Sequence, residues 1–245
     1  MSEDRQGATR GLKAFLLAAG LGTRLRPITD SRPKCLVEVG GRTMLDIWLD
    51  ALAAAGVDEV LVNTHHLAPL VAAQVVERRQ SAPVVRVSHE PQLLGSAGTL
   101  LANRKLVEDE EMFLVVNADN LTDFDLRQLI DGHRAGGAVA TWSVFRAPRP
   151  SECGVVEVDD DGWVIGFTEK PPAPRGDLAN AGMYAFGPQV LEEISTPLPR
   201  DIGFDLLGRL VGRARAVDIG DSYFIDIGTP AALESARQHR GRVTA

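Results

Sequence analysis

The feature that most constrains this chain is an apolar segment that ends in a glycine-rich loop. Residues 14–19 are all apolar, and Gly20, Leu21, Gly22 and Thr23 follow directly. An apolar run that stops at glycines predicts a buried strand followed by a tight turn. Because glycine permits positive φ and a close approach of the backbone, the N–H groups of such a turn can face an anion. The segment therefore predicts a phosphate-binding loop behind a buried strand.

Cationic side chains gather in the same loop. Arg24, Arg26, Arg32 and Lys34 follow the glycines with one acid, Asp30, among them, in a chain whose formal net charge is -7. A general nucleic-acid binder would need a basic face rather than one basic loop. The charge pattern therefore predicts a small anionic ligand and no nucleic-acid partner.

No segment of the sequence indicates secretion or a membrane. A spanning helix needs a run of about 18 apolar residues, which this chain lacks. Residues 1–12, which we expect to form a flexible N-terminal tail, are too polar for a signal peptide. Cys35 and Cys153 are the only cysteines, too few for a disulfide framework. We expect a cytoplasmic protein without a membrane partner.

Predicted strands and helices alternate along the first 145 residues. The hydrophobic pattern predicts strands at 13–19, 59–63, 84–88, 112–117 and 138–145, and helices at 44–55, 67–79, 98–106 and 126–135. Alternation of this kind is typical of right-handed βαβ units around a mostly parallel sheet.

The pattern changes after residue 145. It predicts a hairpin over 154–168, strands at 180–186, 214–219 and 223–227, and helices at 188–194, 204–213 and 230–239. Thr229 caps the last helix, and Pro230 takes its first position. We expect an α/β fold, Rossmann-like and three-layered (α/β/α), with a mixed, mostly parallel central sheet. Residues 13–245 would form one domain, because no linker divides them.

The glycine loop does not match the two best-known phosphate-binding motifs. A dinucleotide-binding fingerprint needs a third glycine where this chain has Leu25, which weakens a nicotinamide-dependent oxidoreductase as an alternative. A Walker loop needs Gly-Lys-Ser/Thr, which does not occur here. What remains is Gly-x-Gly-Thr-Arg, followed ten residues after the arginine by Lys34, which Pro33 precedes.

Two acids stand at the ends of apolar segments. Asp119 follows the predicted strand 112–117, and Asp226 ends the apolar part of SYFIDIGTP. A carboxylate just beyond a buried strand lies at the carboxyl edge of the sheet, where open α/β folds bind ligands. Each acid also has a simpler interpretation, since Asp119 can cap the next turn and Asp226 the closing helix.

Together these motifs resemble the sugar-1-phosphate nucleotidylyltransferases. The resemblance extends from residue 13 to about 239 and rests on GLGTRLRP, PKCLVEV, HEPQLLGSAGTL, VVNADN, CGVVE, TEKPP, LANAGMYAF and FIDIGTP. The short mannose- and heptose-1-phosphate guanylyltransferases are the most similar members. One departure is Cys35, which stands where the family usually has the second proline of Pro-Lys-Pro.

The resemblance implies that the two parts of the domain bind different substrates. Residues 13–145 would bind the nucleotide and residues 146–245 the sugar phosphate. The implied nucleotide-binding residues are Leu17, Ala18, Ala19, Gly20, Gly22, Thr23, Arg24, Lys34, Glu90, Gly95, Ser96 and Ala97. One extra residue around 92–94 affects their placement in the second loop.

The remaining motifs are implied to hold the sugar phosphate and a metal ion. Glu169 and Lys170, by default a solvated surface pair, would bind the sugar phosphate with Asn120, Gly154, Asn180 and Gly182. Asp119 and Asp226 would hold Mg²⁺, a hard cation that suits carboxylates and phosphates. The implied catalytic residues are Arg24, Lys34, Asp119 and Lys170.

The implied reaction joins a nucleoside triphosphate, GTP as the best expectation, to a hexose- or heptose-type sugar 1-phosphate. The products are an NDP-sugar and pyrophosphate. UTP, dTTP, ATP and CTP stay open, as do N-acetylmuramate 1-phosphate uridylyl transfer and a non-catalytic sugar-nucleotide-binding module. Homo-oligomers stay open too, because many relatives self-associate.

Overall fold

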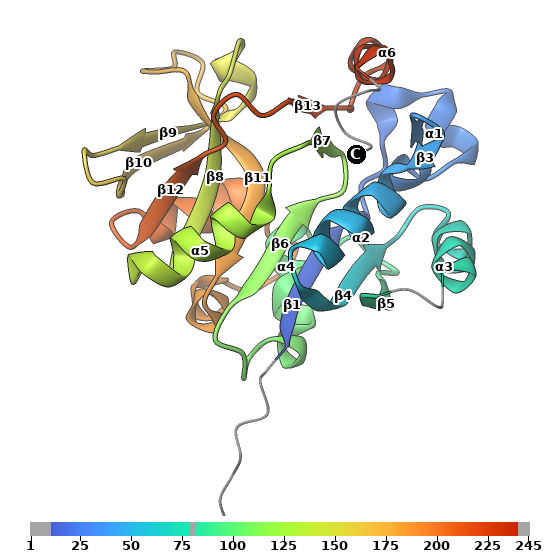
Figure 1. Ribbon diagram of the computed structural model, residues 1–245, viewed down its shortest axis with the longest axis horizontal. Helices are drawn as coiled ribbons and strands as arrows, with labels where there is room; N and C mark the ends of the chain where they lie inside the picture. The colour runs from blue at the N-terminus through green and yellow to red at the C-terminus, as the bar shows by residue number, and fades with distance from the viewer. Residues whose placement is uncertain (1–10, 79–81, 240–245) are drawn as a thin grey trace, which may run out of the picture.

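The described residues form a nine-stranded mixed sheet at the centre of the molecule. The computed structural model describes residues 11–78 and 82–239 (Figure 1). Four strands form its parallel part in the order β6 (Phe113–Asn117), β1 (Leu12–Leu17), β4 (Val57–Thr64) and β5 (Val84–His89). The helices between them are α2 (Met44–Ala54), α3 (Ala68–Glu77) and α4 (Ser96–Ala102), and α5 (Leu126–Gly136) follows β6.

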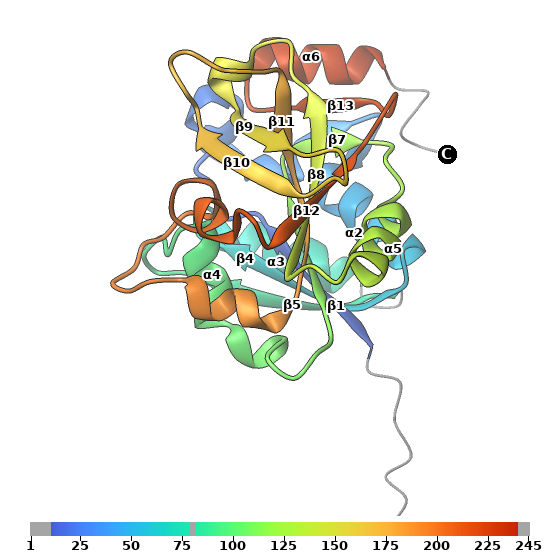
Figure 2. The same cartoon turned by 90° about the vertical axis from the view of Figure 1, so that its left-hand side faces the viewer.

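The second part of the sheet is mostly antiparallel. β11 (Leu178–Phe186) pairs antiparallel with β6, and it also pairs with β8 (Ala140–Arg146) and β9 (Gly154–Val158). β9 and β10 (Val164–Glu169) form the expected hairpin, and β12 (Ala214–Asp218) runs parallel to β8 (Figure 2). The mixed, mostly parallel sheet between helices confirms the expected fold class.

Helices cover both faces of the sheet, so the strands are apolar on both sides. α2 and α5 lie on the face nearest the viewer in Figure 1, with α4 on the far face. A hydrophobic core lies on each face of the sheet, and successive residues of β1 point into different cores. Leu16 packs in the core that contains residues of α2 and α5, and Phe15 packs in the core that contains residues of α4. This explains why residues 14–19 read as one continuous apolar run.

Two small sheets lie apart from the main one. β7 (Asn120–Thr122) pairs antiparallel with β13 (Phe224–Asp226), and β2 (Glu38–Val39) pairs with β3 (Arg42–Thr43). The one-turn helix α1 (Ile28–Ser31) lies within the long first loop, and α6 (Pro230–Gln238) closes the fold. Thr229 accepts a hydrogen bond from the N–H of Ala232 at 3.2 Å, which confirms the expected cap of α6.

Some expected elements differ from the structure. The helix expected over 204–213 is a π-helical turn at Ile202–Leu206 followed by a 3₁₀ turn at Leu207–Leu210, and 188–194 contains a 3₁₀ helix, Pro188–Glu193. Asp201 accepts the N–H groups of Gly203 and Phe204 and so starts the π turn early. Of the expected tail, residues 1–10 lie outside the described residues, and Leu12 already belongs to β1. The division into parts at residue 145 stays a prediction.

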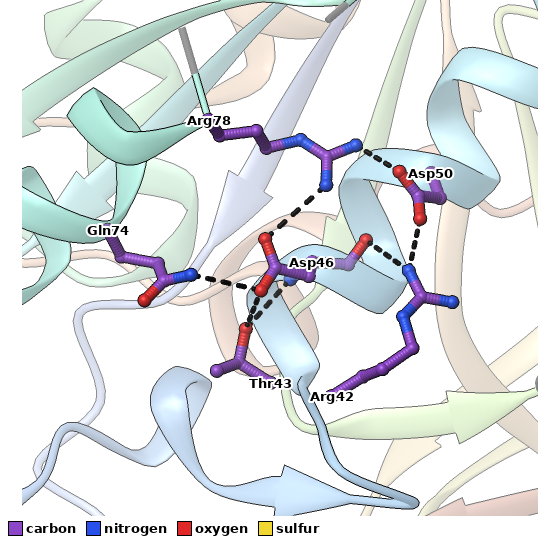
Figure 3. A network of polar contacts seen from close by, with 6 residues as sticks. All are labelled: Arg42, Thr43, Asp46, Asp50, Gln74 and Arg78. Carbon is purple, nitrogen blue, oxygen red and sulfur yellow. Dashed lines mark hydrogen bonds and ion pairs between the residues drawn. The ribbon is translucent and has the colours of Figure 1, made fainter.

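A polar network outside the cleft joins α2 to α3 (Figure 3). Asp46 accepts hydrogen bonds from Thr43 at 2.7 Å, Gln74 at 3.1 Å and Arg78 at 3.3 Å. Asp50 pairs with both Arg78 and Arg42. The network fixes the end of α3 against the start of α2. Within the described ranges, no helix combines the length and apolar character needed to cross a membrane.

Candidate active site

A cleft of about 470 Å³ opens at the carboxyl edge of the parallel strands. Its floor includes Leu17, Asn63 and Asn117, which end or nearly end β1, β4 and β6. Ligands of open α/β sheets bind at this edge, where loops rather than strands supply the contacts. The cleft therefore lies where the sequence predicts a binding site.

Twelve of the predicted site residues line this cleft. They are Leu17, Ala18, Ala19, Gly20, Lys34, Glu90, Gly95, Ser96, Asp119, Glu169, Lys170 and Asn180. The other predicted residues adjoin them. Gly22, Thr23 and Arg24 continue the glycine loop, Ala97 follows Ser96 in α4, and Gly154 pairs with Glu169. Asn120 of β7 pairs with Asp226 of β13, and Gly182 of β11 lies against Asn120. The structure thus brings together residues from the whole length of the chain.

Lys34 lies between the two predicted metal-binding carboxylates. Its Nζ is 2.6 Å from Asp119 Oδ2 and 3.2 Å from Asp226 Oδ1. Arg24 also reaches Asp226, with Nη2 3.4 Å from Oδ2. Asp119 follows β6, and the pairing of Asp226 with Asn120 in β13 and β7 brings the second carboxylate beside the first. The ammonium offsets the repulsion between the two acids.

The two carboxylates also fit a magnesium ion. They are hard oxygen donors, and both contact the same Lys34 ammonium, so their oxygens converge on one position. Within the described part of the chain, no group of three or more His, Cys, Asp or Glu side chains forms a metal cage. A site with two carboxylates suits Mg²⁺, which takes its other ligands from water and phosphate.

The glycine loop depends on a backbone conformation that Gly22 supplies. Gly22 has φ +62°, and a Cβ there would lie 2.8 Å from Cγ2 of Thr29. Its carbonyl accepts hydrogen bonds from the Thr29 hydroxyl at 2.8 Å and the Leu25 N–H at 2.9 Å. Because Thr29 is buried, a side chain at Gly22 would displace the loop that carries Arg24.

A buried network joins the glycine loop to the second predicted nucleotide loop. Asn63 accepts the N–H of Ala18 at 2.6 Å and donates to Glu90 at 2.8 Å. Glu90 also accepts from the Thr99 hydroxyl at 2.6 Å and from the Leu94 N–H at 3.0 Å. Only 2% of Glu90 is exposed. Its carboxylate therefore holds the shape of residues 90–95.

The other end of the cleft is built around a bulge in β11. Asn180 pairs with Val144 of β8, but Tyr184 pairs with Trp142, so the bulged strand has extra residues in between. Gly182 has φ +73°, and a Cβ there would lie 2.5 Å from Asn117 Nδ2. Asn180 donates to the Tyr184 hydroxyl at 2.7 Å, and burial raises the pKa of that hydroxyl.

Glu169 and Lys170 lie at the same end, at the terminus of β10. Burial raises the pKa of Glu169 above its usual value, although the nearby Lys170 ammonium, 3.8 Å away, acts in the opposite direction. Lys170 has φ +47°, a strained conformation for a residue with a side chain, and its N–H bonds to the Cys153 carbonyl at 3.0 Å. A Cβ on Gly154 would lie 2.6 Å from Glu169 Oε2, so this glycine makes room for the carboxylate.

Several cleft residues were not predicted from the sequence. They are Cys35, Asn63, Leu93, Asn117, Ala118, Tyr184, Asp201, Ile202, Gly203 and Phe204. The only signal for the last four is the Asp-x-Gly spacing, which favours a side-chain-capped turn. Burial raises the pKa of the Cys35 thiol to about 12, which disfavours its nucleophilic thiolate form.

The comparison with protein families agrees with this geometry. The model of the nucleotidyl transferase family matches residues 13–241. The chain belongs to the nucleotidyl transferase family. This confirms the resemblance on which the site residues were predicted; the role of each residue stays a prediction.

Relatives of the nucleotidyl transferase are found among guanylyltransferases. The chain is 33% identical to a Dictyostelium discoideum protein and 37% identical to a Drosophila pseudoobscura protein, both named mannose-1-phosphate guanylyltransferase catalytic subunit beta. The matches cover 89% and 90% of this chain but 62% and 60% of the relatives, so it spans about three fifths of their length.

A solved structure has the same fold. HddC from Yersinia pseudotuberculosis, complexed with GMP-PN, superposes with a TM-score of 0.78 at 23% identity. The superposition covers 93% of this chain and 99% of HddC. At this identity the likeness concerns the fold.

Proposed function

We propose that this nucleotidyl transferase joins GTP to mannose 1-phosphate or a closely similar sugar 1-phosphate, releasing pyrophosphate. Family membership supports the reaction class, and the names of the relatives support the base and the sugar. The observation that carries the proposal is the position of Lys34, between Asp119 and Asp226 in a cleft that has the glycine loop and Lys170 along its wall.

The reaction is an in-line displacement at phosphorus. An oxygen of the sugar phosphate forms a bond to the α-phosphorus of the triphosphate. The bond from that phosphorus to the oxygen bridging the β-phosphate breaks, and pyrophosphate leaves with the electron pair. The attacking oxygen is already ionised, so no general base is needed. Positioning and charge stabilisation are then the main sources of catalysis.

Arginine and lysine side chains of the chain would offset the negative charge of the two substrates as they approach each other. Arg24 and the N–H groups of the glycine loop would hold the triphosphate and the departing pyrophosphate. Lys34, only 10% of whose side chain is exposed, would lie beside the α-phosphate and the incoming phosphate. Lys170, at the far end of the cleft, would anchor the phosphate of the sugar. Fixed cations in a partly enclosed site stabilise developing charge without reorganising.

Magnesium enters the proposal through Asp119 and Asp226. When bound, the ion supplies positive charge that offsets the negative charge of the triphosphate. Lys34 and the ion would then share the two carboxylates, because both are attracted to the same oxygens. Glu169, which lines the same end of the cleft, would accept a hydrogen bond from a sugar hydroxyl.

Pyrophosphate release tests the proposal directly. GTP, UTP, dTTP, ATP and CTP are each combined with Mg²⁺ and mannose, glucose, heptose or N-acetylmuramate 1-phosphate. We expect the largest rate with GTP and mannose 1-phosphate. A different preferred pair would correct the substrate and keep the reaction class. Nucleotide binding without release from any pair would instead support a non-catalytic sugar-nucleotide-binding module and refute the proposed function.

A further inference from the structure

One segment of the chain contacts both ends of the cleft. It comprises residues 200–204, which we call the strap, and it includes the start of the π turn Ile202–Leu206. Four of its residues, Asp201, Ile202, Gly203 and Phe204, line the cleft. None of them belongs to a motif from which the site was predicted.

The strap is hydrogen-bonded to the second predicted nucleotide loop. The carbonyl of Arg200 accepts the N–H groups of Ala97 at 3.0 Å and Gly98 at 3.1 Å, at the start of α4. The N–H of Arg200 donates to the Leu94 carbonyl at 2.9 Å. Gly95 has φ +77°, and a Cβ there would lie 2.2 Å from the Arg200 carbonyl oxygen. The two segments therefore approach closely only because residue 95 is glycine.

Ser96 makes the side-chain link between the loop and the strap. Its hydroxyl donates to Asp201 Oδ2 at 2.8 Å and accepts the N–H of Ile202 at 2.7 Å. The other carboxylate oxygen, Asp201 Oδ1, accepts the N–H groups of Gly203 at 2.8 Å and Phe204 at 3.2 Å. The side chain of Asp201 thus connects Ser96 to Gly203 and Phe204 of the strap.

Those two residues lie against the predicted sugar-phosphate groups. A Cβ on Gly203 would lie 2.6 Å from Glu169 Oε2, so the strap backbone contacts this carboxylate closely. The Lys170 ammonium lies over the Phe204 ring, 5.6 Å from its centroid. Phe204 is 67% exposed, although it is a large apolar residue. Its exposure at the cleft leaves the ring accessible to a ligand.

We propose that Ser96 and Asp201 are positioning residues that couple nucleotide binding to sugar-phosphate binding. A nucleotide held at residues 95–97 would fix Ser96, and Asp201 would transmit that constraint to Gly203 and Phe204. Those residues would then hold Glu169 and Lys170 in place for the second substrate. This inference rests on the proposed function.

The test measures coupling rather than activity alone. Calorimetry gives the dissociation constant of mannose 1-phosphate with Mg²⁺, in the presence and absence of a GTP analogue that has a methylene bridge between its α- and β-phosphorus atoms. The ratio of the two constants is the coupling factor. If wild-type turnover favours another pair, that sugar phosphate and the matching analogue replace them.

We expect Ser96→Ala and Asp201→Asn each to reduce the coupling factor about tenfold, the scale of one hydrogen bond to a charged group. The double variant would match the single variants, because both remove the same link. Ser96→Thr, which keeps the hydroxyl, would restore the coupling. Asp159→Asn is the matched control, since Asp159 also accepts two backbone N–H groups, from Asp161 and Trp163, in the turn between β9 and β10.

The outcomes separate the two proposals. An unchanged coupling factor in Ser96→Ala and Asp201→Asn, with an active wild type, would refute the inference and leave the proposed function standing. Binding of mannose 1-phosphate that is weakened by the same factor with and without the analogue would show a purely structural role and also refute it. A wild type that releases no pyrophosphate with any pair would refute the proposed function and, with it, the inference.

Discussion

Replacement of Lys34 by methionine separates the proposed catalytic role of the ammonium from its structural one. Methionine keeps much of the buried aliphatic stem and removes only the charge. The loss of one preorganised stabiliser lowers kcat by about 10²–10³, equivalent to about 2.7–4 kcal/mol. The expected loss of stability is smaller. Asp119 and Asp226, which face Nζ, have side chains 37% and 46% exposed, and pairs screened in this way contribute about 1 kcal/mol or less.

The two effects are measured on the same preparation. Pyrophosphate release gives kcat, and calorimetry gives the unfolding midpoint, which should fall by no more than about 4 °C for a chain of this size. Arg32→Met is the control, because Arg32 belongs to the same loop but pairs with Glu38 at 2.7 Å on the surface. A Lys34→Met variant that folds normally and retains kcat within tenfold of the wild type would refute the assignment of Lys34.

Three other measurements test the site. Gly56→Ala is the reference for the Gly95 variant, because Gly56 has φ +84° and an added Cβ would meet no atom within 4 Å. It should lose about 1–2 kcal/mol of unfolding free energy. Gly95→Ala should lose about 1–3 kcal/mol more through its clash with the strap; equal losses in urea titrations would contradict this. Burial raises the pKa of Glu169 in the folded state. The contribution of its protonated carboxyl to folding stability is therefore present below the unfolded-state pKa of 4.5, and it is lost as the pH rises through the higher folded-state pKa. Glu169→Gln should therefore gain stability relative to the wild type between pH 4 and pH 7, and urea titrations giving the same difference at both pH values would count against it. Asp226→Asn should weaken the binding of Mn²⁺, which is measured by the electron paramagnetic resonance signal of the free ion. Unchanged binding would show that Asp226 does not belong to the metal site.

Local sequence patterns predicted the elements whose signals lie within one segment. The apolar run at residues 14–19 contains most of β1, because a strand buried on both faces is apolar throughout. The glycines after it mark a turn that Gly22 makes at φ +62°. Asp119 was placed correctly at the carboxyl edge because it follows the apolar strand β6, with only Ala118 between Asn117 and Asp119. Thr229 and Pro230 marked the start of α6 for a similarly local reason, since a helix cap acts over three residues.

Contacts between distant short segments could not be read in the same way. β7 and β13 have three residues each, too few to show a period, yet their pairing places Asp226 opposite Asn120 and beside Lys34. The strap likewise carries only an Asp-x-Gly turn as a signal, and its role depends on contacts with Ser96, Glu169 and Lys170.

The sequence by itself determined the buried strand, the cationic glycine loop and the acid at the edge of the sheet. Backbone conformation and hydrophobic burial depend on neighbouring residues, so their pattern can be recognised within a short segment of sequence. The resemblance to a known family implied the pair Asp119 and Asp226, but only the tertiary structure decided that both share the Lys34 ammonium and which segment joins the two ends of the cleft. These depend on strand register and close backbone approach between residues far apart in the chain, for which no single stretch of sequence contains the information.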